Sequence, residues 1–131
     1  MNENQFPETI GDQIIFNSSK SAEAVWLVSP ETNHTISFGQ VHETILEIGQ
    51  RLIETGIERG SSIAIASPNS TASCLLFTAI VSSGFVAVPL NLVAGSAILA
   101  YTIEHSEAKF IFVANDCRDL INSAVSLQNS K

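Results

Sequence analysis

Two short, wholly apolar segments dominate the pattern of apolar and polar positions along the chain. They cover residues 62–66 (SIAIA) and 85–89 (FVAVP), and neither alternates between apolar and polar side chains. A strand without alternation is buried on both faces, which is typical of a parallel sheet covered by helices. Residues 72–83 between them are long enough for a helix, and Gly84 is placed to end it. The pattern therefore predicts a βαβ unit at the centre of a layered domain.

A well-defined helix start precedes this unit. Ser37 and Gln40 have the spacing of a capping box, in which each side chain accepts a hydrogen bond from the other residue's backbone N–H. Apolar residues then recur at helical spacing, at positions 41, 45, 48 and 52, and Gly56 is placed to end the helix. Upstream, residues 25–28 are a candidate strand and residues 29–34 a turn.

Further elements are predicted after the βαβ unit: a helix over residues 96–104, a strand over 109–113 and a helix over 118–127 that Asp116 caps. The inner face of the first of these helices is expected to hold Ile98, Leu99, Thr102 and Ile103. This order of strands and helices requires right-handed crossovers. The predicted fold is therefore α/β, with three layers, βαβαβ order and a largely parallel sheet.

The chain divides into two parts in this interpretation. Residues 1–23 lack periodicity and are rich in polar side chains, so we expect a partly ordered N-terminal arm with a docking point at residues 14–16 (IIF). Residues 24–131 are expected to form one α/β subdomain. The helix predicted over residues 72–83 is apolar nearly all round, which indicates burial on more than one side.

The charge and the apolar pattern of the chain argue against a nucleic acid or a membrane as its partner. The formal net charge is −7, and the six Lys and Arg residues are scattered, whereas binding to a nucleic-acid backbone needs a basic stripe. No apolar segment approaches the roughly 18–20 residues that span a bilayer. The N-terminus (MNENQFPETIGD) is polar and acidic, unlike a signal peptide, so we expect a cytoplasmic protein.

Side chains that can act as nucleophiles, bases or metal ligands are present, but none forms a recognisable catalytic pattern. The glycine patterns of dinucleotide-binding and P-loop folds are absent. The histidines lack partners at metal-ligand spacing: His34, His42 and His105. Two serines are interpreted as helix caps rather than nucleophiles: Ser70 and Ser96. Two cysteines are interpreted as buried or incidental thiols: Cys74 and Cys117. We therefore expect no catalytic residue and no metal site.

Two asparagines are the candidates for ligand contact. Asn69 follows the first buried strand, and Asn91 follows the second. Both positions lie at the carboxyl edge of the predicted sheet, where α/β folds bind ligands. A purely structural role in a turn is the alternative at each position.

Five short segments match one enzyme superfamily in order and spacing. They are residues 35–38 (TISF), 51–60 (RLIETGIERG), 63–70 (IAIASPNS), 84–91 (GFVAVPLN) and 101–109 (YTIEHSEAK). Together they resemble the N-terminal segment of the adenylate-forming (AMP-binding) superfamily, which contains acyl-CoA synthetases, luciferases and the adenylation domains of peptide synthetases. The segment ending in Pro-Leu-Asn is most similar to the acyl- and aryl-CoA synthetase branch.

The resemblance implies the N-terminal scaffold of an enzyme that activates a carboxylate with ATP and Mg²⁺ and then transfers the acyl group to CoA. The family's phosphate loop, ribose-binding Asp and catalytic Lys come later than Lys131, so none of them can be placed on this chain. The chain alone is expected to be inactive and to bind no cofactor. Its expected partner is the remainder of the adenylation domain.

Two alternatives to the scaffold interpretation stay open. The chain can be a free-standing binding or regulatory module, or one half of a split ligase. The resemblance implies a sheet that continues into later sequence, so for a truncated chain we expect open strand edges and an uncovered apolar helix face, which favour self-association.

Overall fold

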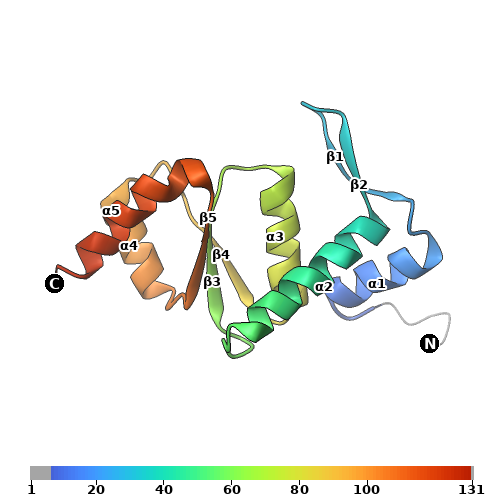
Figure 1. Ribbon diagram of the computed structural model, residues 1–131, viewed down its shortest axis with the longest axis horizontal. Helices are drawn as coiled ribbons and strands as arrows, with labels where there is room; N and C mark the ends of the chain where they lie inside the picture. Colours follow the sequence, from blue (N-terminus) through green and yellow to red (C-terminus); the bar gives the residue numbers. More distant parts are fainter. Residues whose placement is uncertain (1–6, 131) are drawn as a thin grey trace.

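The computed structural model describes residues 7–130, which form five strands, five α-helices and a short 3-10 helix (Figure 1). In chain order these are α1 (Ile10–Lys20), β1 (Val25–Ser29), β2 (His34–Ser37), α2 (Phe38–Glu54), β3 (Ser62–Ala66), α3 (Thr71–Ser82), β4 (Val86–Pro89), α4 (Ser96–His105), β5 (Phe110–Val113), η1 (Asn115–Cys117) and α5 (Arg118–Gln128). No helix in this described part is both long and apolar enough to cross a membrane.

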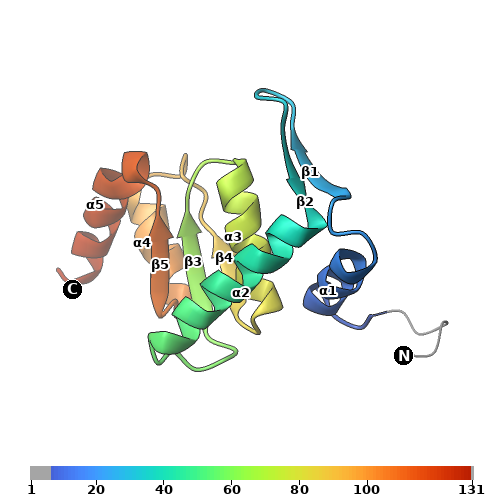
Figure 2. The ribbon, with the colours of Figure 1, turned by 45° about the vertical axis from the view of Figure 1, so that its right-hand side comes forward.

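The central sheet is parallel and has the strand order β4-β3-β5. Helices α2 and α3 lie on one side of it, and α4 and α5 lie on the other (Figures 1 and 2). Strands β1 and β2 form a separate antiparallel hairpin that projects away from the layers. The predicted three-layer α/β fold with a parallel sheet is confirmed, and the candidate strand at residues 25–28 is one arm of this hairpin.

The middle strand β3 is buried on both faces, and its side chains differ in size between them. Ile63 and Ile65 pack into one cluster with residues of α2 and α3. Ala64 and Ala66 pack into another cluster with residues of α4 and α5. All four side chains are at most 4% exposed. The two alanines let helices α4 and α5 approach the sheet closely. The two isoleucines fill the space between the sheet and helices α2 and α3.

The start and end of α2 follow the sequence prediction. Ser37 Oγ accepts a hydrogen bond from the Gln40 N–H at 3.2 Å, and Gln40 Oε1 accepts one from the Ser37 N–H at 2.9 Å. The capping box also fixes the corner between β2 and α2. At the other end, Gly56 has a φ of +78°, the left-handed conformation that terminates helices.

Residues 10–20 form a regular helix, α1, within the segment predicted to be a partly ordered arm. Thr9 caps it by accepting a hydrogen bond from the Asp12 N–H at 3.0 Å. Ile14, within the predicted docking point, is 3% exposed and packs with Ile36 and other residues of the hairpin and α2. Residues 1–6 lie outside the described part of the chain, and the division at residues 23 and 24 stays a prediction.

Helix α3 is covered on more than one side, as its composition predicted. It contacts α1 and α2 as well as β3 and β4. Ala79 and Ile80 are fully buried, whereas Phe77 is 40% exposed. Helix α1, which was not predicted, supplies part of this cover. Leu75, Leu76 and Val81 are half-buried, and the expected uncovered apolar face stays a prediction.

The starts of the last two helices differ from the prediction. Gly95, with a φ of +81°, is the N-cap of α4, and Ser96 is the first helical residue. Cys117 is the N-cap of α5, and Asp116 lies in η1 instead of capping the helix. Neither N-cap makes a side-chain capping hydrogen bond. A 3-10 turn joins β5 to α5, which moves the helix start past the acidic residue.

The buried stripe of α4 is rotated relative to the prediction. Leu99 and Ile103 are buried as expected, but Ala100 is buried with them and Ile98 is 57% exposed. Helix α5 packs on the Ala100 side, where Gln128 Nε2 donates a hydrogen bond to the Ala100 carbonyl at 2.7 Å. The position of α5 therefore decides which side chains of α4 are covered.

Enlarging the small face of β3 is expected to destabilise the fold. Ala64→Leu places a larger side chain where the alanine is 0% exposed, which costs about 1–3 kcal/mol of unfolding free energy. Ala72→Leu, on an exposed position of α3, is the matched control and is expected to stay within about 0.5 kcal/mol. Urea unfolding followed by circular dichroism measures both, and equal stabilities would contradict the packing argument.

Candidate functional site

The two candidate asparagines stand at neighbouring strand ends, as the sequence predicted. Strands β3 and β4 run parallel with Ile65 opposite Pro89, so both end at the same edge of the sheet. Asn69 and Asn91 follow these ends, and both are exposed. Asn91 Oδ1 accepts a hydrogen bond from the Val93 N–H at 3.3 Å, which gives this asparagine a role in its own turn.

Asn69 lines an open groove of about 740 Å³ between the tip of the hairpin and the start of α3. The groove is lined by Ser29, Glu31, Thr32, His34, Asn69, Ser70, Thr71 and Ala72. Asn91 is not among these residues, so the structure does not bring the two asparagines into one pocket. On the hairpin side, Ser29 Oγ donates to Glu31 Oε2 at 3.2 Å and accepts from Thr32 Oγ1 at 3.1 Å. These polar groups stabilise the turn of the hairpin.

Ser70 is a helix cap, as predicted, and it belongs to a complete capping box. Ser70 Oγ accepts from the Ser73 N–H at 3.1 Å, and Ser73 Oγ accepts from the Ser70 N–H at 2.8 Å. The sequence indicated only the first of these bonds, because the reciprocal partner is usually Glu or Gln. The hydroxyls of both serines are thus used to start α3.

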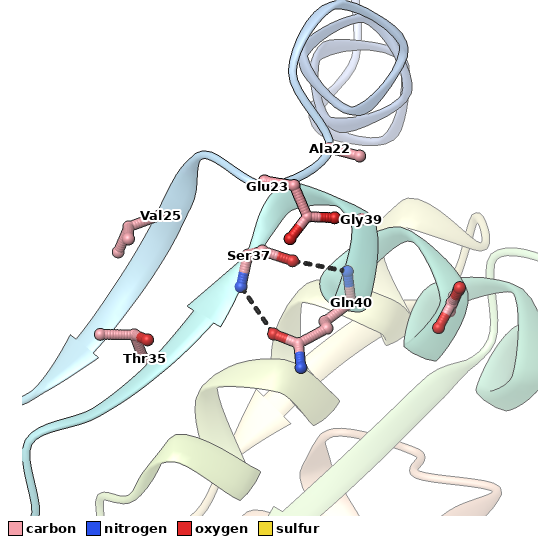
Figure 3. Close-up of a pocket in the computed structure, with 8 residues that line it drawn as sticks. Ala22, Glu23, Val25, Thr35, Ser37, Gly39 and Gln40 are labelled. Carbon is pink, nitrogen blue, oxygen red and sulfur yellow. Dashed lines mark hydrogen bonds between the residues drawn. The ribbon is translucent and has the colours of Figure 1, made fainter.

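A second hollow, of about 450 Å³, lies between the base of the hairpin and the start of α2 (Figure 3). It is lined by Ala22, Glu23, Val25, Thr35, Ser37, Gly39, Gln40 and Glu43. The Ser37–Gln40 capping bonds lie within it. Glu43 of α2 shares this hollow with Glu23, a proximity that no local sequence pattern indicates. Two carboxylates in its lining make this hollow unfavourable for an anionic ligand.

The three histidines lie on different elements. His34 begins β2, His42 is on α2, and His105 ends α4, where its ring stacks on Tyr101 with the centroids 5.4 Å apart. Within residues 7–130, no group of three or more His, Cys, Asp or Glu side chains is arranged to hold a metal ion.

Cys74 and Cys117 are free thiols, and Cys117 is buried. Burial raises the pKa of the Cys117 thiol, and the neighbouring Asp116 carboxylate raises the pKa further, both by its charge and by a hydrogen bond from Sγ to Oδ1 at 3.6 Å. A raised pKa keeps the thiol protonated near neutral pH, which makes it a weak nucleophile. Cys117 is thus part of the core between the sheet and α5.

The fold and the motif order together place the chain in a known family. The sequence model described as AMP-binding enzyme matches residues 16–131, and the chain belongs to this family. Sulfoacetate–CoA ligase from Cupriavidus necator is 25% identical over 90% of this chain. The N-terminal domain of FACL13 from Mycobacterium tuberculosis superposes with a TM-score of 0.80 at 23% identity over 89% of this chain. The anthranilate CoA ligase AuaEII superposes with a TM-score of 0.81 at 22% identity over 96% of this chain.

These comparisons also show how much of such proteins the chain represents. It spans 23% of the sulfoacetate–CoA ligase, 29% of the FACL13 N-terminal domain chain and 24% of the AuaEII chain. The chain thus corresponds to an N-terminal portion, about a quarter in length, of an acyl- or aryl-CoA ligase type of adenylate-forming enzyme.

The two serines at helix starts are expected to differ in their contribution to stability. Ser70→Ala removes a capping hydrogen bond and is expected to cost about 1 kcal/mol of unfolding free energy. Ser96→Ala is the control, because Ser96 follows the N-cap Gly95, and its expected change is within about 0.5 kcal/mol. Chemical denaturation of both variants tests this difference, and a larger loss for Ser96→Ala would refute the assignment of the caps.

The Cys117 thiol is expected to react slowly in the folded chain. In a Cys74→Ser variant, its reaction with DTNB at pH 8 should be at least about tenfold slower than in the urea-unfolded chain, because little thiolate is present and access is blocked. Since the folded state holds this proton more tightly, the stabilisation linked to it is present below the unfolded pKa and is lost as pH rises through the folded pKa. Equal rates in the folded and unfolded chains would contradict the burial and the raised pKa.

Proposed function

We propose that this chain is the N-terminal scaffold portion of an ATP-dependent acyl- or aryl-CoA ligase. In this proposal the whole enzyme joins a carboxylate to ATP as an acyl-adenylate and then transfers the acyl group to CoA. The supporting observation is the match to the AMP-binding family over residues 16–131, combined with a chain about a quarter as long as its relatives. The partner of the chain is then the remainder of the adenylation domain.

The residues of the chain support a structural role in that enzyme. Several polar side chains in the two hollows hold helix starts in place: Ser37 and Gln40 in one hollow, and Ser70, which pairs with Ser73, in the other. The chain has no glycine-rich phosphate loop, and among its described residues no three His, Cys, Asp or Glu side chains are grouped to hold a metal ion. We therefore assign ATP, Mg²⁺ and CoA to the whole enzyme and no cofactor to this chain alone. A cytoplasmic location stays a prediction.

Asn69 and Asn91 are the residues of this chain that we assign to the ligand-binding edge of the whole enzyme. Both are exposed and follow adjacent parallel strands, and α/β sheets bind ligands at this edge. Val93, two residues after Asn91, is 92% exposed, which is consistent with a loop that other parts of the enzyme cover.

The isolated chain is expected to catalyse no carboxylate-dependent exchange between ATP and pyrophosphate. The assay uses acetate, medium- and long-chain fatty acids and benzoate, with labelled pyrophosphate. A full-length acyl-CoA ligase serves as the positive control, and the chain without carboxylate gives the background. Exchange clearly above that background would overturn the assignment of a non-catalytic scaffold.

The coding sequence after Lys131 separates this proposal from its alternatives. A reading frame that continues into a phosphate loop ending in Pro-Lys-Gly supports the scaffold of a single enzyme. A stop codon at that point would overturn that assignment and favour a free-standing module or one half of a split ligase.

A further inference from the structure

We draw no further inference here: the strongest candidate, the apolar groove between α1 and α2 that Ile15, Leu46 and Ile53 line, carries none because nothing in the structure shows what covers it.

Discussion

Burial of β3 on both faces is the constraint on which the rest of the structure depends. The buried residues 63–66 of this strand are all apolar, and their side chains pack against two helix layers. Ile63 and Ile65 give one layer large side chains to pack against, whereas Ala64 and Ala66 let the other layer approach closely. Strands β4 and β5 lie beside this strand, and helices α2 to α5 pack across its two faces.

Local hydrogen bonds at helix starts fix the points where the chain changes direction between strands and helices. The capping boxes at Ser37 and Ser70 fix where the chain leaves a strand and enters α2 or α3. Ser37 and Gln40 line one of the two hollows described above, and Ser70 lines the other. The hydroxyls of these serines are already used in capping bonds, which agrees with the proposed scaffold role.

The two edges of the central sheet differ in the backbone groups that they offer to a further strand. Pro89 removes a donor from the outer side of β4, while β5 keeps a full set of outward backbone groups. A further strand can therefore pair with the full set of outward backbone groups of β5, whereas on β4 it would lack the donor at Pro89. Asn69 and Asn91 follow the carboxyl ends of the strands, whereas a further strand is added at the side of the sheet. Extension of the sheet therefore leaves these ends accessible.

The sequence by itself determined the parallel sheet, the α2 and α3 caps and the family, because apolar runs, cap spacing and ordered motifs are local signals. Only the tertiary structure decided what depends on contacts between distant segments. Helix α1 is held by burial of Ile14 against α2 and the hairpin, and the buried stripe of α4 is set by α5 at Ala100. That Asn69 lines the groove beside the hairpin, whereas Asn91 does not, is likewise decided by the position of the hairpin. Contacts between residues remote in sequence decide these features, so the local spacing of residues along the chain does not predict them.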